Sequence, residues 1–214
     1  ADSEVRIHSD VSIAAPSIQR FMDIEVDWTV SVNGAVTVNL LAKRNMEFPE
    51  LPRFGLRLFL DQSLENVTYY GLGPMENYVD KRHAAHHGLF TNTVDGLHED
   101  YIRPQENGAH FGCKWATLSN EGGVGIAIFS LYDGDFSLSA SHYSPEKLTA
   151  TAYNWELVPD GDITLIIDYR NSAVGSNSCG PRLRKKVQIN EHEISFSFRI
   201  KPVSFSGFNP FIEY

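Results

Sequence analysis

The sequence has little cysteine and no long apolar run. Only two cysteines occur among its 214 residues, which excludes a scaffold held together by several disulfides. Their spacing neither requires nor excludes a bond between Cys113 and Cys179. No stretch approaches the roughly 20 consecutive apolar residues that a membrane-spanning helix needs. The sequence therefore predicts a globular chain without a membrane partner.

Positive charge is also scarce. Eighteen Lys and Arg residues stand against 27 Asp and Glu residues, so the formal net charge is -9 at pH 7. A field of this sign repels a phosphate backbone, which excludes nucleic acid as a partner. The one basic run covers residues 182–186. We interpret it as a solvated strand edge, where Lys and Arg oppose edge-to-edge aggregation.

Helical periodicity is nearly absent, and alternation of apolar with polar residues takes its place. We expect one short helical turn at residues 144–148, with Ser144 as its cap and Pro145 in the first helical position. Turns rich in Gly, Asn and Asp separate the alternating segments, which is typical of an all-β sandwich. The poorly patterned residues 71–112 are expected to carry loops. The expected strands cover residues 28–32, 36–40, 54–60, 66–71, 123–129, 136–140, 162–169 and 193–201.

The dipeptide Asn33-Gly34 predicts a hairpin between the first two of these strands. A two-residue turn would distribute the apolar residues over both faces of the hairpin. A three-residue loop of residues 33–35 pairs Val32 with Val36 and Val30 with Val38, which gathers the apolar residues on one face. We therefore favour the three-residue loop.

Four ordered segments carry a resemblance to a known family. Residues 70–78 read Tyr-Gly-Leu-Gly-Pro-Met-Glu-Asn-Tyr and are followed by Asp80 and Arg82; residues 101–108 read Tyr-Ile-Arg-Pro-Gln-Glu-Asn-Gly. Residues 135–144 end in His-Tyr-Ser, and residues 175–181 read Gly-Ser-Asn-Ser-Cys-Gly-Pro. In order and spacing, these segments resemble the C-terminal, small-chain domain of family 2 β-galactosidases from about residue 28 to residue 202.

The resemblance implies a fold, a reaction and a set of partners. The fold would be a large antiparallel β-supersandwich like that of galactose mutarotase, forming one domain over 1–214 with a core of about 20–203 and a tail of 204–214. The parent enzyme would be a bacterial retaining glycosidase, cytoplasmic or periplasmic, that hydrolyses terminal β-D-galactosides such as lactose. Its catalytic glutamates would lie in a (β/α) barrel, which this strand pattern does not contain. The partners would then be the other domains or a large subunit, in a homo-oligomer of the parent, and this chain alone would be inactive and need no cofactor.

The resemblance also implies site residues. The motif loops contribute Gly73, Glu76, Asn77, Arg82, Glu106 and Asn107. One late loop reaches the substrate in the family, and in some members a tryptophan there stacks on the sugar. Cys179 occupies that position here and cannot stack in that way, which leaves Asn177 and Ser178 to bond a hydroxyl. The alternative for residues 175–181 is a tight turn that leads into the next strand.

Other readings of single residues stay open at this point. Glu76 and Glu106 form either a catalytic carboxylate pair or two acceptors that hold loops, and we favour the second reading. His83, His86, His87 and His98 cluster in sequence, but without a confident helix or a clear third ligand they predict no metal site. His110 and His142 would serve a mutarotase-like aldose epimerase. The aromatic side chains of Trp115, Tyr143, Tyr153 and Trp155 would serve a stand-alone carbohydrate-binding module, although core packing is the simpler reading.

Overall fold

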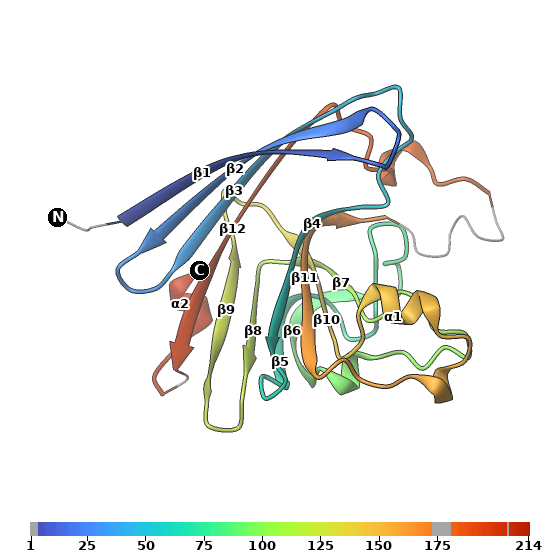
Figure 1. Ribbon diagram of the computed structural model, residues 1–214. Helices are drawn as coiled ribbons and strands as arrows, with labels where there is room; N and C mark the ends of the chain where they lie inside the picture. The colour runs from blue at the N-terminus through green and yellow to red at the C-terminus, as the bar shows by residue number, and fades with distance from the viewer. Residues whose placement is uncertain (1–3, 173–180, 205) are drawn as a thin grey trace.

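The computed structural model describes residues 4–172, 181–204 and 206–214. Two antiparallel sheets make up the described structure (Figure 1), which confirms the all-β sandwich. The larger sheet has the strand order β1-β2-β3-β12-β9-β8-β5-β6, and the smaller has the order β4-β11-β10-β7. The strands are β1 (Glu4–Ala14), β2 (Arg20–Ser31), β3 (Val36–Arg44), β4 (Arg53–Asp61), β5 (Asn66–Gly73), β6 (His86–Thr93), β7 (His110–Cys113), β8 (Trp115–Ser119), β9 (Val124–Ser130), β10 (Phe136–Ser141), β11 (Asp162–Asn171) and β12 (Glu193–Ser204).

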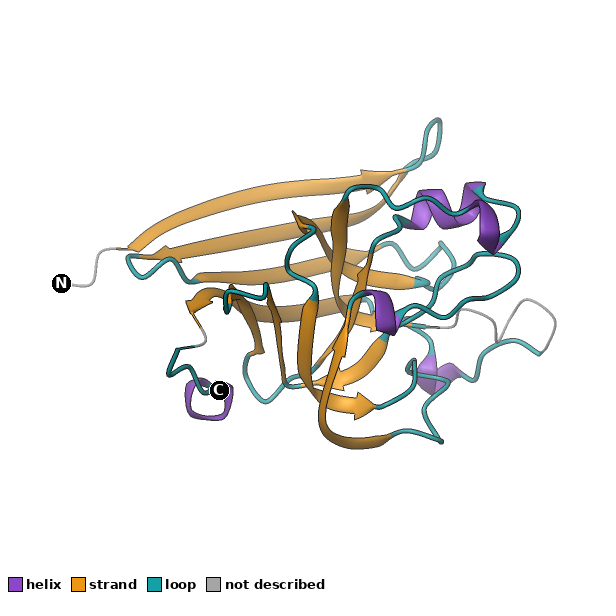
Figure 2. Ribbon diagram, turned by 90° about the horizontal axis from the view of Figure 1, so that it is seen from below, coloured by secondary structure: helices purple, strands orange, loops and turns teal. Residues whose placement is uncertain are grey.

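The helices are short, and they lie in the connections between strands or after the last strand (Figure 2). The expected helical turn is confirmed as α1 (Pro145–Ala150), where the Ser144 hydroxyl accepts from the amide of Lys147. The remaining helices are η1 (Asp95–Leu97), η2 (Asn154–Glu156), η3 (Lys185–Val187) and α2 (Pro210–Glu213). Among the described residues, no helix has the length and apolar character that crossing a membrane requires.

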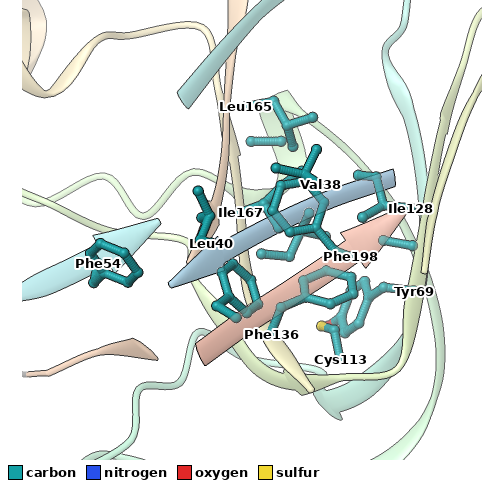
Figure 3. Packing of buried hydrophobic residues seen from close by; sticks show 14 of the residues in the cluster. Val38, Leu40, Phe54, Tyr69, Cys113, Ile128, Phe136, Leu165, Ile167 and Phe198 are labelled. Carbon is teal, nitrogen blue, oxygen red and sulfur yellow. The ribbon is translucent and has the colours of Figure 1, made fainter. Parts of the chain in front are cut away.

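The main core lies between the two sheets (Figure 3). Alternation explains its composition, because every second residue of a strand points to the same face. The larger sheet contributes Val38 of β3 and Phe198 of β12, which are fully buried. The smaller sheet contributes Leu165 and Ile167 of β11, which are also fully buried. A second cluster around Trp115 and Phe129 lies on the outer face of the larger sheet.

The predicted register of the first hairpin is wrong by two residues. Val30 pairs with Val36 and Trp28 with Val38, so the three loop residues are 32–34 instead of 33–35. Gly34 takes a φ of +80°, which glycine adopts without strain. The shift of two residues keeps the same side chains on the core face, and it leaves Val32 exposed in the loop.

Several parts of the chain differ from the sequence-based expectations. Strand β1 lies before residue 20, where no strand was expected. Strand β6 and all but the last residue of β7 lie within residues 71–112, which were expected to carry loops. The basic run is not a strand edge, because residues 185–187 form η3 and Arg182 pairs with Glu50.

Candidate functional site

The first motif begins at the end of β5, where the chain is too crowded for any side chain at residue 73. A Cβ atom on Gly73 would lie 2.5 Å from the Tyr69 hydroxyl oxygen and 2.8 Å from the Phe90 ring. The following Gly73–Pro74 peptide is cis. Glycine at position 73 therefore lets the chain leave the sheet directly beside these two aromatic rings.

Glu76 is a buried carboxylate that joins three parts of the motif region. It accepts hydrogen bonds from the Lys81 ammonium, from the Tyr101 hydroxyl and, at 3.0 Å, from the amide of Gly108. Burial on its own would raise the pKa of Glu76, but these donors outweigh burial and hold the pKa below its ordinary value. The carboxylate is therefore charged at neutral pH and fixes residues 76–81 against residues 101–108.

Asn77 connects the motif loop to β7. Its side-chain amide donates to the carbonyls of Leu72 and Met75 at 2.9 and 3.0 Å. Its side-chain oxygen accepts from the amide of Phe111 at 2.8 Å. Because all of these partners are backbone groups, Asn77 fixes the path of the chain.

A buried tyrosine–histidine pair lies beneath this loop. The hydroxyl of Tyr69 and Nδ1 of His110 are 2.9 Å apart, and His110 is 1% exposed. Burial lowers the pKa of His110 to about 4, so its ring is neutral at pH 7. Burial also raises the pKa of Tyr69, which keeps that hydroxyl protonated.

A second buried network surrounds Arg53, the first residue of β4. Its guanidinium binds Asp168 of β11 at 2.6 Å and Glu106 of the second motif at 2.8 Å. Asn171 donates to the other oxygen of Glu106 at 3.2 Å. Burial raises the pKa of Asp168 to about 6 although Arg53 opposes this shift, so Asp168 is a carboxylate at pH 7. Nearby, Asn107 accepts from the amide of Glu99 at 3.0 Å.

Residues on both sides of the segment 173–180 are attached to residues 50–52. On one side, the amide of Ser172 donates to the carbonyl of Pro52 at 2.8 Å and its hydroxyl to Leu51 at 3.2 Å. On the other side, the Arg182 guanidinium binds Glu50 at 2.6 Å. The predicted substrate contacts Asn177, Ser178 and Cys179 lie outside the described residues.

Residues 79–83 lie between two clefts. One has a volume of about 440 Å³, and Arg82 and residues 181–184 contribute to its wall. The other has a volume of about 630 Å³ and is formed mainly by residues 75–85. The Arg82 guanidinium lies over the Phe111 ring at 5.1 Å. Of the predicted motif residues, Arg82 lines both clefts, and Glu76 and Asn77 line the second.

The residues considered for a metal site, an epimerase or a carbohydrate-binding module do not come together in one place. His86 and His87 are consecutive residues of β6, and no group of three metal-ligating side chains occurs in the described part of the chain. His142 pairs with Glu65 at 2.9 Å, whereas His110 is buried. Trp115 is buried, while Tyr153 and Trp155 are exposed. Nothing in this geometry favours an epimerase.

Sequence reasoning missed Arg53, Asp168 and Asn171. Their partner Glu106 was found through its motif, but these three belong to strands that read as apolar. One signal was available, because Asp168 follows the largely apolar run Ile-Thr-Leu-Ile-Ile of residues 163–167. A carboxylate continuing such a run requires a cation, since a buried charge is costly unless it is paired.

Comparisons with known proteins agree with the family resemblance of the sequence motifs. A family model described as β-galactosidase small chain matches residues 1–200. The β-galactosidase of Actinobacillus pleuropneumoniae is 36% identical over 92% of this chain and 19% of its own length. That of Staphylococcus xylosus is 37% identical over 94% of this chain and 20% of its own length. The chain thus spans about a fifth of these relatives.

One solved structure, of an Aspergillus nidulans amine oxidase, covers 99% of this chain and 39% of its own, with a TM-score of 0.37 and 8% identity. That similarity is too weak to bear on the fold. The family match covers most of the chain, and the two curated relatives share more than a third of the aligned residues. The chain belongs to the β-galactosidase small-chain family.

Proposed function

We propose that this chain is the C-terminal part of a bacterial family 2 β-galactosidase that hydrolyses terminal β-D-galactosides such as lactose with retention. In this proposal the chain forms part of the active-site wall and holds no cofactor of its own. The catalytic glutamates belong to a barrel outside these 214 residues. The parent enzyme acts as a homo-oligomer.

The structural observation that supports this proposal is the bonding of residues 172 and 182 to residues 50–52. Both flanks of the segment 173–180 are bonded to residues 50–52, and Arg53 extends this attachment into the network of Glu106 and Asp168. Such an arrangement suits a loop that must meet a substrate at a fixed place, because catalysis depends on accurate positioning. Asn177 and Ser178 would bond a sugar hydroxyl there, beside Cys179.

Glu76 and Glu106 are better suited to holding this wall than to catalysis. A retaining glycosidase needs two carboxyl groups about 5–5.5 Å apart, one of which attacks the sugar as a nucleophile. Glu76 already accepts from Lys81, Tyr101 and Gly108, and Glu106 accepts from Arg53 and Asn171. These bonds would have to break before either group could act on a sugar.

The test compares the 214-residue chain with the full-length parent on a chromogenic β-galactoside. We expect turnover by the parent alone, with the β-anomer of galactose released first when the products are followed by NMR. Changing Asn177 to Ala in the parent should raise KM for the galactoside, whereas the exposed control Glu121→Gln should leave it unchanged. Turnover by the purified chain, or initial release of the α-anomer, would contradict the proposal.

A further inference from the structure

The apolar side of β1 is uncovered although it continues the core face of the larger sheet. Residues of β1 alternate, with Val5, Ile7, Val11 and Ile13 on one side, interrupted by Ser9, and mainly charged or polar residues on the other. Pairing of β1 with β2 places Ile7 beside Trp28 and Val11 beside Ile24, on the side that faces the core. The four apolar residues of this side, which we call the β1 stripe, are nevertheless between 38% and 61% exposed.

Burial decreases steadily toward this edge of the larger sheet. Val38 and Ala42 of β3 are fully buried, and Ile24 of β2 is 8% exposed. Ile7 of β1 is 51% exposed. In Figure 1, β1 and β2 run outward toward the N-terminus, away from the strands of the smaller sheet. The larger sheet has eight strands and the smaller has four, so the smaller sheet ends before it can cover β1.

The smaller sheet ends at β4, and this strand has an open edge. Among the described residues β4 pairs only with β11. Its inward side chains Leu56, Leu58 and Leu60 are half-buried, whereas the neighbouring Leu165 and Ile167 of β11 are fully buried. An open edge of nine residues and an uncovered apolar stripe are both hazards for aggregation, and native proteins usually cover such features.

We propose that the remainder of the parent β-galactosidase covers both features, with one of its β-strands added to the open edge of β4 and its apolar side chains placed on the β1 stripe. This inference rests on the proposed function in that the partner is the rest of the same enzyme. Pairing with β4 would satisfy the backbone groups of its open edge, and apolar side chains of the same partner would cover Val5, Ile7, Val11 and Ile13. The relatives supply ample chain for this, since 80% or more of their length lies outside the matched region.

Hydrogen exchange on the full-length parent and on the 214-residue chain tests the proposal directly. We expect amides of β4 on its open side to exchange slowly in the parent and fast in the chain alone, with β11 amides equally protected in both. Equal exchange of all β4 amides in the two proteins would overturn the proposal. Protection that develops in the chain alone as its concentration rises would identify a second copy as the occupant, and would overturn it as well.

Paired substitutions give a second test that does not depend on exchange data. Ile7→Lys places a charge on the β1 stripe, and His8→Lys places one on the opposite side of the same strand. Ile7→Lys should lower the melting temperature of the parent by several degrees but hardly change that of the chain alone, and His8→Lys should change neither. Equal effects of the two variants in the parent would contradict the proposal. These readouts do not use galactoside turnover, so a parent with another activity would leave the result interpretable.

Discussion

The buried pair of Tyr69 and His110 makes folding depend on pH. The ordinary pKa of 6.5 for histidine falls to about 4 at His110 in the folded chain. The unfolded chain therefore binds a proton in this interval that the folded chain does not bind. Stability from His110 is fully present above pH 6.5 and is lost as the pH falls toward 4, by about 3 kcal/mol in total.

The prediction is tested with His110→Gln, whose amide can still bond Tyr69. Urea unfolding of both proteins should show the wild-type advantage shrinking by about 3 kcal/mol between pH 7 and pH 4. The comparison of two proteins matters because Asp168, whose pKa is raised to about 6, acts with the opposite sign. Its contribution increases as the pH falls through 6, and it cancels in the difference. An advantage that stays constant with pH would contradict the prediction.

Sequence reasoning found those site residues that belong to contiguous motifs. Glu76, Asn77 and Glu106 stand in segments whose glycines and prolines are visible without a structure. Arg53 and Asp168 are 115 positions apart and meet only because β4 and β11 are neighbours. No local pattern predicts such a pair, since its partners come together through strand pairing over a long separation.

At the scale of strands, the sequence pattern predicted several elements well. Strands β4, β10 and β12 were expected from alternation, and β11 was expected from its apolar run. Strand β8 was missed because it is covered on both faces. Trp115 contacts the outer cluster while Ala116 and Leu118 join the main core, so its residues do not alternate. Strand β1 was missed although it alternates, and its apolar side is uncovered in this chain.

Gly73 gives a prediction for the end of β5. Changing Gly73 to Ala should cost about 1–3 kcal/mol, because the new methyl group overlaps the Tyr69 hydroxyl and the Phe90 ring. Both rings pack in the core or against it, which limits how far they can move. Gly122→Ala in the exposed turn before β9 is the matched control and should cost well under half as much. If both variants unfolded at the same urea concentration, the structure would relieve the crowding around residue 73 without loss of stability. That result would contradict the prediction.

At the scale of the whole molecule, the two faces of the larger sheet are covered by different means. The smaller sheet covers the inner face from β2 onward, because Met22, Ile24 and Val26 of β2 are buried in the main core. The C-terminal tail contributes cover on the outer face, where Phe211 lies 5.1 Å from the Trp115 ring and 5.3 Å from the Tyr70 ring. Phe211 of the tail therefore packs on this chain itself.

This packing predicts that the tail stabilises the chain. Phe211→Ala should lower the free energy of unfolding by about 1 kcal/mol, since it removes an edge-to-face contact and uncovers part of Trp115. The adjacent Ile212 is 82% exposed and makes Ile212→Ala the matched control, with little expected change.

Tryptophan fluorescence gives a second readout, because emission from Trp115 should shift to longer wavelength only when Phe211 is removed. The Lys201–Glu213 ion pair at 2.6 Å holds α2 near β12 in both variants, so the comparison isolates the aromatic contact. Equal stability of Phe211→Ala and Ile212→Ala would mean that the tail lies on the sheet without stabilising it, and the outer face would then need cover from elsewhere in the parent.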